Sequence, residues 1–166
     1  MDDFHFSIDL PVRSEWANVD ILRTSVQNCF AAIFSDIDGC RALAMVTGEL
    51  IENAIKYGDW SAHSVLDDQR FRLRVWGEGH RAHVSVENPV RRGDKHAEEV
   101  LRTIGWLRTF ASTSDAYRAR LLEIAAGSRE PGDSKLGLVR IAYEGNCKLT
   151  AELVRGVLHV QAELTV

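Results

Sequence analysis

Hydrophobic and polar residues alternate in five short stretches of the chain, and strict alternation is the pattern of a half-buried β-strand. The alternating stretches are residues 3–10, 71–76, 82–88, 149–153 and 158–164. Turn residues lie between the second and third stretches, at Gly77-Glu78-Gly79, and between the last two, at Arg155-Gly156. The pattern therefore predicts five strands and joins four of them into two hairpins.

Apolar residues recur at helical spacing in most of the remaining chain. The expected helices cover residues 14–34, 41–58, 94–110, 114–126 and 135–143, and Asp38-Gly39 is expected to break the chain between the first two. Such an order of strands and helices is typical of the α+β class. The simplest packing is a two-layer α/β sandwich, in which a mixed, mostly antiparallel five-stranded sheet carries the helices on one face.

Composition limits the size and the class of the protein. With 166 residues and 45% hydrophobic content, the chain can bury one core and is too short for two ordinary domains, so we expect a single domain over 1–166. The net charge of −4 and the pI near 5.9 argue against a nucleic-acid binder. The N-terminus lacks the pattern of a signal peptide, and no stretch approaches the roughly 18 apolar residues of a membrane span. We therefore expect a cytoplasmic protein that binds neither nucleic acid nor membrane.

The cysteines and histidines do not form a recognisable metal or disulfide pattern. The three cysteines, Cys29, Cys40 and Cys147, are an odd number without C-x-x-C spacing. We expect them to be small buried side chains in a reducing compartment. The six histidines are scattered without metal-ligand spacing, so packing or surface roles are expected for them.

The helix expected at 41–58 has an apolar face and a polar stripe beside it. The apolar face consists of Leu43, Val46, Leu50, Ala54 and Tyr57. The polar stripe consists of Glu49, Glu52, Asn53 and Lys56.

Glu49 and Asn53 are four residues apart and therefore neighbours on one side of the helix. A carboxylate there can orient or deprotonate a nucleophile, and amide oxygens suit Mg²⁺ when phosphates supply other ligands. The alternative is an ordinary solvated face.

The residues E-L-I-E-N-A-I-K-Y-G at 49–58 resemble the N-box of the Bergerat-fold ATPases, the GHKL superfamily, whose pattern is E-x-x-x-N-A-x-[KR]-[HY]. Five residues match this pattern: Glu49, Asn53, Ala54, Lys56 and Tyr57. The resemblance implies that the chain has the Bergerat, or histidine-kinase-like ATPase, fold and binds ATP and Mg²⁺. It implies that Glu49 is the general base, that Asn53 is the Mg²⁺ ligand, and that Lys56 and Tyr57 belong to the nucleotide site.

The adenine-binding motif of the superfamily, D-x-G-x-G, is replaced in this chain by Glu87-Asn88-Pro89. Asn88 shares the strand face of Val84 and Val86, so it is expected to point toward the helix that carries Asn53, whereas Glu87 faces the other way. The amide oxygen of Asn88 can accept a hydrogen bond from an adenine amine, although more weakly than a carboxylate. A plain turn at the end of the strand is the alternative.

The last superfamily motif, G-x-G-L-G, corresponds to the segment at 132–138. Lys135 stands where the family has a glycine, whereas Gly137 and Leu138 keep the closing part of the motif. The resemblance assigns all three residues to the nucleotide site, with Lys135 as a point charge for phosphate. The preceding polar loop, residues 127–133, belongs to a helical insertion at 91–133 that is a candidate ATP lid, or else an ordinary connection between helices.

The element order resembles the single-domain anti-sigma and partner-switching serine/threonine kinases, and the Glu-Asn pair in place of D-x-G-x-G resembles the SiaB-type subgroup. This resemblance implies a bacterial kinase that phosphorylates a serine or threonine of a small antagonist protein. One alternative is a catalytically inactive module of the same fold that sequesters a sigma factor or another regulator. Another is an unrelated α/β domain with a chance N-box. The resemblance also makes a homodimer plausible, and the edge strand at 3–10 can support one.

Overall fold

The computed structural model describes residues 4–10, 16–33, 37–59, 71–78, 80–127 and 136–165. In chain order the elements are β1 (Phe4–Leu10), α1 (Trp16–Ile33), α2 (Ile37–Tyr57), β2 (Phe71–Glu78), β3 (Arg81–Pro89), α3 (Lys95–Leu107), α4 (Thr113–Ala125), α5 (Leu136–Glu144), β4 (Cys147–Val154) and β5 (Val157–Thr165). The predicted order of strands and helices is thus confirmed.

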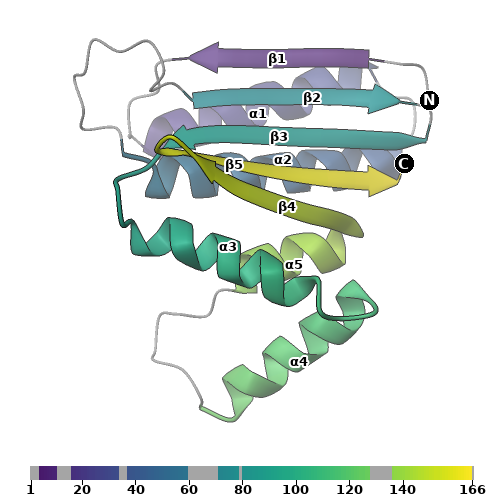
Figure 1. Ribbon diagram of the computed structural model, residues 1–166. Helices are drawn as coiled ribbons and strands as arrows, with labels where there is room; N and C mark the ends of the chain where they lie inside the picture. The colour runs from purple at the N-terminus through teal and green to yellow at the C-terminus, as the bar shows by residue number, and fades with distance from the viewer. Residues whose placement is uncertain are drawn as a thin grey trace.

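The strands form a single sheet in the order β1-β2-β3-β5-β4 (Figure 1). All four pairings between neighbouring strands are antiparallel. The α+β class and the antiparallel character are confirmed. The expectation of a mixed sheet is wrong for the described strands. Strands β2 and β3 form one hairpin, and β4 and β5 form another. Strand β1 runs opposite to β2, and β5 runs opposite to β3, so the two remaining pairings are antiparallel as well.

The two faces of the sheet differ in polarity. Leu73 pairs with Val86, and Val75 pairs with Val84; all four side chains are buried beneath α2. The alternate positions of β2, such as Arg74, point to the opposite face and are exposed or half-buried. Figure 1 shows α1 and α2 behind the sheet, with α3 and α5 near β4. The helices therefore cover one face, as the alternation predicts.

Helix α4 is an exception to the simple two-layer arrangement. It packs on α5 rather than on the sheet, and it lies farthest from the strands in Figure 1. The ring of Tyr117 in α4 stacks on Tyr143 in α5, with the ring centroids 4.6 Å apart. The guanidinium of Arg120, which is 2% exposed, lies 4.2 Å from the ring centroid of Trp106 in α3. Aromatic stacking and a cation–π contact therefore hold α4 in place.

The central helix α2 begins earlier than its apolar pattern predicts. Leu43, Val46 and Leu50 are buried as expected, at 0%, 0% and 2% exposure. The predicted break at Asp38-Gly39 is wrong, because both residues lie in the first turn of the helix. Asp38 is favourable there, since a carboxylate offsets the positive end of the helix dipole.

The ends of other elements agree with local sequence signals. Asp94 caps α3, because its carboxylate accepts hydrogen bonds from the backbone N–H groups of His96 and Ala97 at 2.8 and 3.0 Å. The β4–β5 turn contains Arg155 and Gly156 with φ of 51° and 81°, the conformation of a type I′ hairpin. Strand β2 continues through Glu78, so the first hairpin turn is shorter than the predicted Gly77-Glu78-Gly79 turn.

No helix in the described part of the chain has both the length and the apolar character that a bilayer crossing requires. The cysteines are free thiols, and Cys147 alone of the three is buried, whereas Cys29 and Cys40 are half-buried. The expectation of burial is therefore correct for Cys147 only. Burial raises the pKa of the Cys147 thiol to about 12.

This thiol makes the stability of the fold depend on pH. Between about pH 9 and pH 12 the unfolded chain releases the Cys147 proton and the folded chain keeps it, so stability present below this window is lost as pH rises. We expect Cys147→Ala to remove a slope of up to about 1.4 kcal/mol per pH unit in the free energy of unfolding. Urea titrations of both proteins over this window measure the difference, and parallel pH profiles would contradict it.

Gly145, just after α5, has no room for a side chain. A Cβ atom there would lie 2.5 Å from Cγ2 of Val46 and 2.7 Å from the carbonyl oxygen of Ile141. We expect Gly145→Ala to lower the free energy of unfolding by about 1–3 kcal/mol through overpacking. The matched control is Gly105→Ala in α3, where a Cβ meets nothing within 4 Å and the change is expected to stabilise the helix by roughly 0.5–1 kcal/mol. Urea unfolding curves give both values, and equal effects would refute the steric argument.

Candidate functional site

A narrow cleft lies between the C-terminal half of α2, the end of β3 and the beginnings of α3, α5 and β5. Its lining residues are Leu50, Asn53, Ala54, Tyr57, Val86, Asn88, His96, Val100, Leu138, Leu158 and Val160. Its free volume of about 20 Å³ holds about one water molecule. The cleft is therefore closed against a larger ligand in this conformation.

Two carboxamides supply the polar groups of this cleft from separate elements. Asn53 lies on α2 and is half-buried, whereas Asn88 lies near the end of β3 and is 2% exposed. The side-chain N–H of Asn88 donates a long hydrogen bond, 3.4 Å, to the carbonyl oxygen of Pro89. The parity of β3 predicts that Asn88 points toward the helix layer, and this prediction is confirmed. An amide offers both a donor and an acceptor to a ligand.

The remaining walls of the cleft are mostly apolar or aromatic. Val86, Val100 and Leu158 are buried side chains from three different elements. The ring of Tyr57 stacks on the ring of His96, with centroids 3.5 Å apart and planes 19° apart. Local spacing gives no signal for this pair, because the two residues are far apart in sequence. Apolar walls with two convergent amides are typical of a site for a flat, partly polar ligand.

Backbone and side-chain contacts fix α2 against the end of β3. The backbone N–H of Asp59 donates to the carbonyl oxygen of Pro89 at 2.8 Å. The carboxylate of Asp59 accepts hydrogen bonds from Nε and a terminal nitrogen of Arg91 at 3.1 and 3.4 Å. The hydrogen bond to Asp59 and its negative charge raise the pKa of Arg91. These contacts hold Asn53 and Asn88 on the two sides of one cleft.

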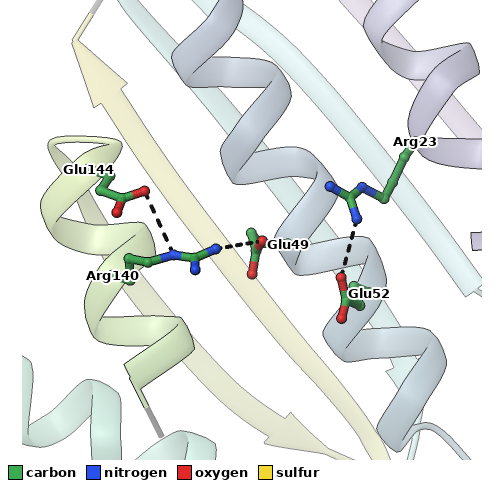
Figure 2. A network of polar contacts seen from close by, with 5 residues as sticks. All are labelled: Arg23, Glu49, Glu52, Arg140 and Glu144. Carbon is green, nitrogen blue, oxygen red and sulfur yellow. Dashed lines mark hydrogen bonds and ion pairs between the residues drawn. The ribbon is translucent and has the colours of Figure 1, made fainter. Parts of the chain in front are cut away.

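Glu49 lies one turn before Asn53 and contacts α5 (Figure 2). Its carboxylate accepts a hydrogen bond from a terminal nitrogen of Arg140 at 2.9 Å, and Nε of Arg140 lies 3.7 Å from the carboxylate of Glu144. One guanidinium therefore bridges two carboxylates. Sequence reasoning missed Arg140. Its spacing of four residues from Glu144 is a signal for the contact within α5, but no local spacing indicates the contact with Glu49.

The other acidic residue of the stripe has a different partner. Glu52 pairs with Arg23 of α1 at 3.3 Å, on the side of α2 away from Arg140 (Figure 2). Lys56 is exposed, and its ammonium lies 5.0 Å from the ring centroid of Tyr57 without lining the cleft. The polar stripe of α2 is thus divided between two neighbouring helices and solvent, with Asn53 directed to the cleft.

The motif residues outside α2 are also distributed between the cleft and other surfaces. Glu87 points to the open face of the sheet as predicted, where it pairs with Arg72 and Arg74 at 3.4 and 3.3 Å. Leu138 lines the cleft, whereas Gly137 lies beside it at the start of α5. Lys135 and most of the candidate lid loop lie outside the described residues.

The side chains that line the cleft suit the chemistry of a nucleotide, but the present volume of the cleft is too small to hold one. Asn88 and the apolar walls fit an adenine ring, and the amide oxygen of Asn53 fits Mg²⁺. No group of three His, Cys, Asp or Glu side chains in the described segments is arranged to hold a metal. A metal bound at Asn53 therefore needs further ligands from phosphates and water. A nucleotide also requires the walls to separate.

The Glu49–Arg140 contact can be tested as an ion pair. The Glu49 and Arg140 side chains are 21% and 41% exposed, so solvent screens only part of their attraction. A double-mutant cycle of Glu49→Ala and Arg140→Ala is expected to give a coupling free energy of about 1 kcal/mol in urea unfolding. The matched cycle of Arg23→Ala and Glu52→Ala is expected to give a smaller coupling, because that contact is longer, at 3.3 Å. Zero coupling between Glu49 and Arg140 would rule out a stabilising pair.

Comparison with known proteins gives a structural match. A chain in the crystal structure of the SiaB–SiaC complex from Pseudomonas aeruginosa superposes on this chain with a TM-score of 0.62. The two sequences are 17% identical, and the match covers 97% of this chain and 89% of that chain. No family model and no curated protein matches the sequence. At this identity the structural match shows a common fold.

Proposed function

We propose that this protein is an ATP-dependent kinase of the anti-sigma or partner-switching type, which phosphorylates a serine or threonine of a small regulatory protein. The observation that carries the proposal is the convergence of three motif segments on one cleft. Asn53 of the N-box, Asn88 of the adenine segment and Leu138 of the closing motif all line it. These segments are distant in sequence, and their convergence supports the Bergerat assignment.

In this proposal each residue acts on a separate part of the reaction. Asn88 accepts a hydrogen bond from the adenine amine, and the apolar walls contain the ring. Asn53 holds Mg²⁺, which neutralises phosphate charge. Glu49 orients the partner's hydroxyl and accepts its proton, the hydroxyl oxygen forms a bond to the γ-phosphorus, and ADP leaves. Lys56, Tyr57, Lys135 and Gly137 complete the nucleotide site by resemblance.

The resting geometry requires two changes before transfer. The cleft must widen, because about 20 Å³ does not hold a nucleotide. Arg140 must also leave Glu49, because the carboxylate oxygen that accepts a hydrogen bond from the guanidinium must be free before it can accept one from the partner's hydroxyl. The phosphates of ATP offer Arg140 a competing anion, so nucleotide binding and release of Glu49 are coupled in this scheme.

The protein partner is inferred from the structural match. The matched chain comes from a complex of SiaB with SiaC, and we infer that this chain also acts on a small regulatory protein. The closed cleft and the Glu49–Arg140 pair favour a second candidate function. In that alternative the chain is an inactive module of the same fold that sequesters a sigma factor or another regulator.

Nucleotide titration tests the proposal directly. Calorimetry with ATP, with and without Mg²⁺, is expected to give Mg²⁺-dependent binding to the unchanged protein. Asn53→Ala is expected to weaken binding by about tenfold or more, because it removes the metal ligand. Asn28→Ala, which changes an exposed asparagine on α1, is the matched control and is expected to bind normally. Circular dichroism confirms that both variants fold.

The outcomes separate the two functions. If the unchanged protein does not bind ATP at roughly millimolar concentration, where even a weak site with Kd near 1 mM is half filled, the kinase proposal fails and the sequestering module remains. If ATP binds, transfer of labelled γ-phosphate to a small protein encoded beside this chain measures the kinase activity itself. Equal Mg²⁺-dependent binding by Asn53→Ala would defeat the role of Asn53.

A further inference from the structure

A second hollow, much larger than the cleft, lies between the α3–α4 connection and the beginning of β4. We call it the α3–β4 groove, and its volume is about 730 Å³. We propose that this groove binds an acidic segment of a protein partner in an extended conformation. The inference goes beyond the proposed nucleotide chemistry, because it assigns a separate surface to partner recognition.

The charge of the groove supports an acidic ligand. Arg108 at the end of α3 and Lys148 in β4 are both exposed, and neither side chain forms an ion pair with another described residue. Arg81 also lines the groove and pairs with Glu163 at 3.5 Å. The groove therefore has two uncompensated positive charges, although the whole chain has a net charge of −4. Complementary carboxylates would be attracted to it.

The floor of the groove supplies apolar anchoring surface. Leu149 of β4 is 5% exposed, and Leu107 and Phe110 are half-buried. The ring of Phe110 lies edge-on to Trp106, with centroids 4.6 Å apart, and this contact stabilises its orientation. Apolar side chains that alternate with carboxylates in the ligand would place the former on this floor and the latter beside Arg108 and Lys148.

The shape of the groove favours a polypeptide over a small molecule. Its volume falls within the range of small-molecule pockets, about 300–1,000 Å³, but such pockets enclose most of their ligand. More than half of the residues that line this groove are exposed, including Ser112 and Thr150 at its sides. A hollow with so many exposed lining residues contacts one side of a bound chain and does not enclose it. Nucleic acid is disfavoured by the carboxylate of Glu163 and the acidic net charge.

The groove and the cleft lie at opposite ends of the same elements. In α3 the cleft residues are His96 and Val100, whereas Leu107 lines the groove. In β3 the corresponding residues are Asn88 and Arg81. No residue lines both cavities, so a partner segment in the groove does not occupy the cleft. Binding in the groove is measured without nucleotide, and its failure is distinct from failure of the kinase proposal.

Fluorescence anisotropy of the full chain tests the inference. The probe is a fluorescein-labelled nine-residue peptide of Glu and Asp with Leu and Phe at alternate positions, and its counterpart carries Lys in place of each acid. We expect the acidic peptide to bind and the Lys peptide not to bind. The double variant Arg108→Glu/Lys148→Glu is expected to weaken binding by about tenfold or more, because two attractions become repulsions.

The matched control is Arg92→Glu/Arg118→Glu, which changes the net charge equally at two exposed positions outside the groove. It is expected to bind the acidic peptide within about twofold of the unchanged protein, apart from a long-range effect that added salt screens. Equal weakening by both double variants, or no binding to the unchanged protein, would overturn the inference. Full displacement of the peptide by citrate at equimolar concentration would also overturn it, by assigning the groove to small anions.

Discussion

The hydrogen bond from the backbone N–H of Asp59 to the carbonyl oxygen of Pro89 joins the end of α2 to the end of β3. The candidate site depends on this join, because Asn53 and Asn88 come from these two elements. Arg91 reinforces it by binding the carboxylate of Asp59. The backbone carbonyl of Pro89 thus has a structural role, since it fixes the position of the end of α2 relative to the end of β3.

The sequence predicts those features that depend on periodicity within one element. The apolar face of α2 is buried at Leu43, Val46 and Leu50, because a helix repeats every 3.6 residues. Asn88 reaches the cleft and Glu87 the open face, because neighbouring side chains of a strand point to opposite sides. The direction of each of these side chains follows from the periodicity of its own segment, so it can be derived without knowledge of distant residues.

Contacts between distant elements could not be derived in the same way. Arg140 and Glu49 are 91 residues apart, and their pairing depends on how α5 packs beside α2. The stacking of Tyr57 on His96 likewise depends on the start of α3, which Asp94 caps. The width of the cleft is set by side chains from five elements at once. A motif can therefore indicate which residues form a site, but not whether the site is open.

The strand order also has a consequence for how the chain folds. The two hairpins are local, with Glu78 paired to Arg81 and Val154 paired to Val157. Strand β1 instead pairs with β2 through Leu10 and Phe71, which are roughly 60 residues apart. Closing that loop costs about 3 kcal/mol more chain entropy than closing a hairpin. Loop entropy therefore favours early formation of the two hairpins. One edge of β2 stays unpaired until β1 pairs with it, because α1 and α2 lie between these two strands in the sequence.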